Sequence, residues 1–156
     1  MKKSLFFIGV ISLLIVGCKS NSPGGDNIKI ENKFNKNIIC VLGYNYPNLS
    51  LDFINKKALQ AKTELHDSYV MSSEIEVGTT KVIDTLGLCN KEIWNKTIKH
   101  SMLMLFVFDK EKLFGTNTVP AVGKIEDALI GRYYFTYDQV MKTKGVITVD
   151  ASKNNL

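Results

Sequence analysis

The alternation of apolar and polar residues indicates where the first strands of the chain lie. Ile28 and Ile30 alternate with charged neighbours, which is the pattern of a strand with one face in water. The run 38–44 is apolar on both faces, and the seven residues 102–108 are apolar without a break before Asp109. We therefore expect these two runs to be strands that are buried on both sides.

Shorter patterns predict the remaining elements. In chain order these are a weak helical pattern from Ile54 to Leu65 behind Asp52, a hairpin or a strand, turn and strand at 75–77 and 81–83, a helix capped by Asn90 with Trp94 on its apolar side, a short helix or loop within 110–127, a strand at 128–135, a short helix opened by the T-x-x-Q capping box at 136–139, and a closing strand at 146–149. Strands outnumber helices. The predicted fold is therefore mainly β with α (α+β), a mostly antiparallel sheet or two-layer sandwich with short helical connections.

The first 17 residues have the form of an export signal. Lys2 and Lys3 form a basic start, and the apolar run 5–16 is shorter than the about 20 residues that span a bilayer. Residues 15–18 are Ile-Val-Gly-Cys, which resembles the lipobox where signal peptidase II cleaves before a lipid-modified cysteine. We expect Cys18 to become an acylated N-terminus, held in a membrane by two or three acyl chains because one chain alone holds only marginally.

These features divide the chain into four segments. They are the signal peptide 1–17, the acylated cysteine with a flexible Gly- and Ser-rich tether 18–26, a single globular domain 27–150 and a frayed C-terminus 151–156. The anchor predicts an exported protein on a bacterial membrane. We expect the outer membrane, on its periplasmic face or at the cell surface.

Charge argues against a nucleic-acid partner. The formal net charge of +5 falls by two, to +3, when Lys2 and Lys3 leave with the signal. The basic residues are spread along the chain, and all but Arg132 are lysines. Nucleic-acid surfaces cluster their positive charges and use arginine forks, so we expect no nucleic-acid binding.

Cys40 and Cys89 are the two cysteines of the mature domain. An exported location permits a disulfide between them, closing a loop of about 50 residues worth about 4 kcal/mol, and two buried thiols are the alternative. His66 and His100 lie far apart, and no Cys-x-x-Cys spacing occurs. We therefore expect no metal site and no cofactor.

No pattern indicates a catalytic site. The neighbours His66, Asp67 and Ser68 cannot adopt triad geometry, and no G-x-S-x-G elbow occurs. The carboxylate pairs, Glu74 with Glu76 and Glu126 with Asp127, could serve a glycosidase, although solvated faces are more common. We expect the protein not to be an enzyme.

A set of tyrosines with one arginine is the candidate binding surface. Its members are Arg132, Tyr133, Tyr134 and Tyr137, with Tyr44 and Tyr46 elsewhere in the chain. Such residues are enriched at interfaces, although alternate tyrosines also pack in cores, and Arg132 could instead pair with Asp109 or Asp138.

Several of these segments together resemble a group of small lipoproteins of Bacteroides-type bacteria. The resemblance rests on the lipobox, the opening strand with residues 44–47, the helix 89–94, the run 103–109, and residues 132–133 followed by 136–149. Gly145 and Val146 stand where the group has Asn and Trp, and the group implies no activity to transfer. Thr85, in an Asp-Thr-Leu sequence, resembles an O-glycosylation acceptor of such bacteria.

The expected function is that of a membrane-anchored, non-enzymatic module that binds another protein or a glycan. Two alternatives stay open at this point. One is a small cell-envelope hydrolase, and the other is an immunity or inhibitor lipoprotein against a toxin or lysozyme.

Overall fold

The computed structural model describes residues 27–51, 54, 72–83, 85, 87–118 and 120–153. The elements in these ranges are β1 (Ile28–Asn32), β2 (Ile38–Gly43), β3 (Ser72–Ile75), β4 (Thr80–Ile83), α2 (Lys91–Thr97), η1 (Lys99–Ser101), β5 (Met102–Asp109), α3 (Lys110–Phe114), η2 (Ile125–Ala128), β6 (Leu129–Thr136), α4 (Tyr137–Lys142), β7 (Val146–Val149) and η3 (Ala151–Lys153). The signal, Cys18, the tether and the expected helix after Ile54 lie outside the described residues.

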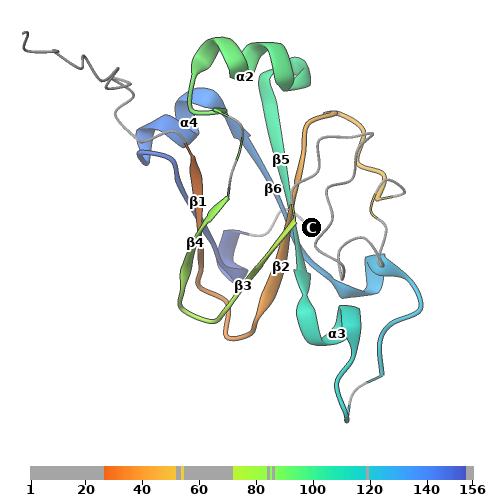
Figure 1. Cartoon of the computed structure of the whole chain (residues 1–156). Coiled ribbons are helices and arrows are strands. Elements are labelled where there is room, and N and C mark those ends of the chain that lie inside the picture. Colours follow the sequence, from red (N-terminus) through yellow and green to blue (C-terminus); the bar gives the residue numbers. More distant parts are fainter. Residues whose placement is uncertain are drawn as a thin grey trace, which may run out of the picture.

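The strands form two sheets, so the predicted α+β fold with a two-layer β arrangement is confirmed (Figure 1). One sheet has the order β4-β1-β7 and the other β3-β2-β5-β6. Every neighbouring pair is antiparallel except β1 with β7. Strands β3 and β4 follow each other in the chain but belong to different sheets, so the segment 72–83 is a strand, turn and strand that links the layers.

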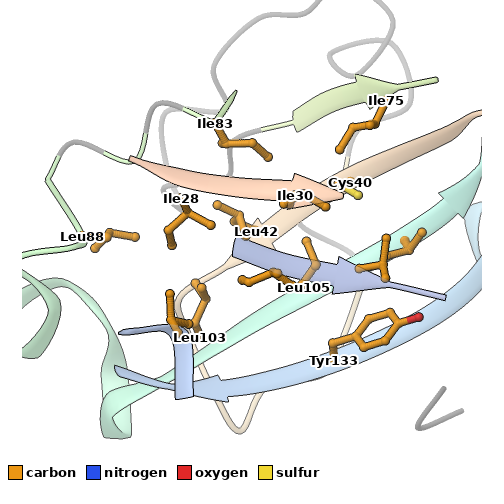
Figure 2. Packing of buried hydrophobic residues seen from close by; sticks show 14 of the residues in the cluster. Ile28, Ile30, Cys40, Leu42, Ile75, Ile83, Leu88, Leu103, Leu105 and Tyr133 are labelled. Atoms are coloured by element: carbon orange, nitrogen blue, oxygen red, sulfur yellow. The ribbon is translucent and has the colours of Figure 1, made fainter. Parts of the chain in front are cut away.

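The main core lies between the two sheets. Figure 2 shows Ile28 and Ile30 of β1 packed towards Leu42 of β2 and Leu105 of β5. A second apolar cluster covers the other face of the four-stranded sheet and includes Phe106 with residues of α3 and η2. Because both faces of β2 and β5 are covered, their side chains are apolar on both sides, which confirms the expectation for these strands.

Asn32, at the end of β1, joins the two layers at one corner. Its side chain is fully buried, and Nδ2 donates to the carbonyl oxygens of Lys36 (2.9 Å), Ile75 (3.1 Å) and Glu76 (3.1 Å). Its Oδ1 accepts from Phe34 N–H at 2.9 Å. One amide thus ties the β1–β2 connection to the β3–β4 turn, and satisfies buried backbone groups of both.

Two helices begin where their caps predict. Asn90 accepts hydrogen bonds from the first turn of α2, and Thr136 with Gln139 forms the capping box of α4. Trp94 of α2 is fully buried and packs edge-to-face against Tyr137 of α4, with ring centroids 5.6 Å apart. The helices in the described part of the chain are too short to cross a membrane.

Candidate binding groove at the open edge of the sandwich

The predicted tyrosine surface is divided between the two faces of β6. Successive side chains of a strand point to opposite faces, so Tyr133 enters the core between the sheets while Arg132 and Tyr134 lie on the other face. The expectation that these residues form one surface is therefore wrong.

Tyr133 has a packing role. It is buried, its ring stacks on Phe135 with centroids 6.4 Å apart, and its hydroxyl donates to Asp150 O at 2.6 Å. Burial raises the pKa of Tyr133 to about 12. The hydroxyl is therefore bound by the backbone after β7 and is not available to a ligand.

Tyr137 connects α4 to α2. Its hydroxyl donates to Cys89 O at 2.9 Å, and Lys91 Nζ lies 5.6 Å from its ring centroid. Its ring is partly buried against Trp94. These contacts hold the two helices together at one end of the sandwich.

Arg132 and Tyr134 lie on the outer face of the four-stranded sheet. Tyr134 meets Tyr46 edge-to-face with centroids 6.0 Å apart. Arg132 Nε is buried and has no hydrogen-bond partner among the described residues. The alternative, that Arg132 pairs with Asp109 or Asp138, is not found among the described residues, where Asp109 pairs with Lys36 at 2.9 Å and Asp138 lies 3.8 Å from Lys91 of α2.

A groove opens between β6, α4 and β7, on the side of the sandwich where both sheets end. Its volume is about 290 Å³. It is lined by Tyr133, Tyr134, Phe135, Gln139, Val140, Thr143, Val146, Ile147 and Thr148. Sequence reasoning identified the β6 residues but missed the other wall, because no local pattern predicts which strand edges will lie side by side.

Among the described strands, β7 has no neighbour on this side. Lys29 N–H donates to Gly145 O at 2.8 Å, and Lys29 lies opposite Val146 in the parallel register. In a parallel ladder alternate residues bond to the neighbouring strand, so the odd-numbered residues of β7 bond to β1. The peptide groups of Thr148 consequently face the open edge.

The same reasoning applies to β6. Lys110 N–H donates to Asn37 O at 3.2 Å, which extends the antiparallel ladder of β2 and β5. Even-numbered residues of β5 therefore bond to β2, and odd-numbered ones bond to residues 131, 133 and 135 of β6. The peptide groups of Arg132 and Tyr134 are left facing outwards, and Tyr134 lines the same groove as Thr148.

Cys40 and Cys89 are two buried thiols, and the predicted disulfide is not formed. Cys40 lies within β2, between Ser73 and Val107 of the neighbouring strands. Cys89 follows Leu88, which Figure 2 shows at the opposite end of the core from Cys40. Burial raises the pKa of the Cys40 thiol above its usual range, so this group is protonated and unreactive at neutral pH.

Thr85 does not present a hydroxyl for glycosylation. The residue is only 2% exposed, and Oγ1 is buried without a hydrogen-bond partner among the described residues. Its backbone N–H donates to Asn27 Oδ1 at 3.4 Å, and its carbonyl accepts from Leu88 N–H at 3.1 Å. The folded domain therefore closes this position to a transferase, which corrects the expectation from the sequence.

The carboxylate pairs and histidines considered as catalytic candidates do not form a site in the described part of the chain. Glu74 is ion-paired with Lys110, and β3 ends at Ile75, so Glu76 lies in the turn instead of sharing a strand face with Glu74. Glu126 and Asp127 are exposed on η2, His100 is exposed on η1, and residues 66–68 lie outside the described part. The described ranges contain no group of three His, Cys, Asp or Glu residues that could hold a metal ion.

Comparison of the chain with models of protein families, with curated proteins and with solved structures finds no match.

Proposed function

We propose that the protein is a non-enzymatic binding module, anchored to a bacterial membrane through acylated Cys18, which captures an extended segment of another protein. The observation that supports the binding site is that, among the described strands, β6 and β7 are the outer strands of their sheets, and Tyr134 and Thr148, whose peptide groups face outwards, line one groove. An extended peptide supplies the matching row of N–H and C=O groups, as in recognition by β-strand addition.

The composition of this edge favours such a partner. Exposed edges are usually protected from pairing by lysine or proline. The stretches 133–135 and 146–148 contain neither, and they carry no charge. The edge of β4, by contrast, carries Lys81, so the two open sides of the three-stranded sheet differ in their protection.

The groove also provides a place for a side chain of the partner. Phe135, Val140 and Ile147 supply apolar surface, and Gln139 and Thr143 supply polar groups at its margin. A volume of about 290 Å³ is at the small end for a ligand site, so it suits one or two apolar side chains. In strand addition the backbone gives affinity and such pockets give specificity.

The proposed partner is a protein, and a toxin bound in this way would make the module an immunity protein. No arrangement among the described residues favours the hydrolase. A strand edge pairs with the regularly spaced N–H and C=O groups of an extended peptide, which a glycan lacks. The proposed partner is therefore a protein and not a glycan.

A backbone-directed variant tests the proposal in the acylated full-length protein. Thr148→Pro removes the outward N–H but leaves the bonds of odd-numbered residues to β1, since proline is tolerated on an edge strand when its missing N–H faces outwards. Thr148→Val is the matched control, because both changes remove the hydrogen bond from Thr148 Oγ1 to Glu31 Oε2 (2.9 Å).

The readout is photo-crosslinking in native envelopes from a photoreactive residue at position 146. We expect one protein adduct in the parent and in Thr148→Val, and at least tenfold less adduct in Thr148→Pro at an unchanged melting temperature. Equal adducts in the two variants, no adduct in any of them, or binding of glycans in place of proteins would contradict the proposal.

A further inference from the structure

The end of the sandwich that carries α2 and α4 is strongly basic. The exposed charged residues on α2, η1, α4 and the turn after α4 are the lysines Lys91, Lys96, Lys99, Lys142 and Lys144, against Glu92 and Asp138. Lys96 pairs with Glu92 at 2.7 Å, but Lys99, Lys142 and Lys144 have no acidic partner among the described residues. We call these five lysines the basic end.

Contacts place these lysines at one end of the molecule. Lys91 Nζ lies 3.8 Å from Asp138, which joins the starts of α2 and α4. Gly145, directly after Lys144, accepts a hydrogen bond from Lys29 N–H at 2.8 Å, at the start of β1. In Figure 1, α2 and α4 lie at the same end of the sheets as the start of β1.

The chain enters the domain at this same end. Nine residues, from Cys18 to Asp26, precede the first described residue, Asn27. At full extension they reach at most about 30 Å. The start of β1, beside the basic end, would therefore lie within about 30 Å of an acylated Cys18.

We propose that the basic end lies against an anionic bilayer and orients the domain on it. This inference rests on the proposed lipid anchor and adds to it a second, electrostatic contact. Each lysine near an anionic surface strengthens binding by about fivefold at physiological salt. With the anchor already holding the domain at the membrane, a few such contacts are enough to select one orientation.

An apolar side chain in the basic end favours a lipid surface over an acidic protein or nucleic acid. Ile93 lies on α2 between the lysines and is 38% exposed. Basic residues around an exposed apolar residue match the headgroup and acyl boundary of a bilayer.

The opposite end carries charges of both signs. Lys36 and Lys110 are paired with Asp109 and Glu74, and the exposed acids Glu111, Glu126 and Asp127 lie there beside the exposed lysines Lys112 and Lys124. The excess of positive charge is therefore found at the basic end and not at this one.

Lysine labelling on vesicles tests the orientation. The acylated protein is bound to vesicles of phosphatidylcholine alone, or of phosphatidylcholine with phosphatidylglycerol. An amine reagent then modifies exposed lysines, which are counted by mass spectrometry. We expect Lys91, Lys96 and Lys142 to be protected at least fivefold relative to Lys81 on the anionic vesicles only, and the protection to be lost in 0.5 M NaCl, where charge interactions are screened within about 4 Å.

Charge-reversal variants supply the control. Lys99→Glu with Lys144→Glu should abolish the protection, whereas Lys112→Glu with Lys124→Glu, the same change at exposed positions of the other end, should preserve it. Equal labelling on both kinds of vesicle, with the protein still bound, would overturn the orientation but leave the anchor intact. Protein that stays out of both vesicle fractions would overturn the anchor and the orientation together.

Discussion

Replacement of Asn32 by alanine tests whether one buried amide holds the two sheets together. The side chain makes four hydrogen bonds, of which those to Ile75 O and from Phe34 N–H are fully buried. Alanine leaves these two backbone groups without the amide, and each buried unsatisfied group costs about 1–3 kcal/mol. We expect Asn32→Ala to lower the free energy of unfolding by about 4 kcal/mol. The total free energy of unfolding of a typical domain is only about 5–15 kcal/mol, so this is a large loss.

Urea denaturation monitored by Trp94 fluorescence measures the effect. Asn48→Ala is the matched control, because the exposed Asn48 makes one local bond, from Ser50 N–H at 3.0 Å. It should cost less than about 1 kcal/mol. If Asn32→Ala lowers the free energy of unfolding by less than about 1 kcal/mol, with an unchanged slope against urea concentration, the junction of the two sheets does not depend on this amide.

Three further predictions concern protonation and thiols. The pKa of Tyr133 is about 12 in the folded protein and about 10 in an unfolded chain. The contribution of Tyr133 to stability is therefore lost as the pH rises from 10 to 12. Tyr133→Phe should be less stable than the parent at pH 8 by about 1 kcal/mol, and its melting temperature should fall less between pH 10 and pH 12. Burial raises the pKa of Asp109, but the Lys36 ammonium and backbone N–H groups outweigh it and hold the pKa below its usual range. The ionised carboxylate therefore stabilises the fold above about pH 4, and this contribution is lost as the pH falls further. Asp109→Asn should show a smaller decline in the free energy of unfolding, measured with urea, between pH 5 and pH 2. Cys40 and Cys89 should resist a thiol reagent in the native protein and both react in urea without reductant, whereas no reaction in urea would show a disulfide.

The sequence predicted those elements that depend on an apolar run or on a cap within one helical turn. The run 102–108 is apolar on both faces because β5 is covered on both, and the caps at Asn90 and Thr136 act within one helical turn. These signals involve residues near each other in the chain. They therefore gave β5, α2 and α4 close to their observed bounds.

Contacts between distant segments were not predictable in this way. Asn32 opens a mostly polar stretch of the sequence, and nothing near it in the chain reveals that Ile75 O would need its amide. The sequence analysis placed Tyr133 and Tyr134 in one candidate surface, although the alternation of a strand sends them to opposite faces, and no local pattern indicates that the far wall of the groove is β7. The binding groove depends on where the edges of two sheets end, which is a property of the assembled layers.

The mass of the mature N-terminus shows whether Cys18 holds the domain at a membrane. The protein is purified from the membrane fraction of its native cells and its N-terminal peptide is analysed by mass spectrometry. We expect a peptide that begins at Cys18 and carries two or three acyl chains, and we expect the protein to be absent from membranes of a Cys18→Ser variant. An unmodified N-terminus at any other residue would show that Cys18 is not the anchor.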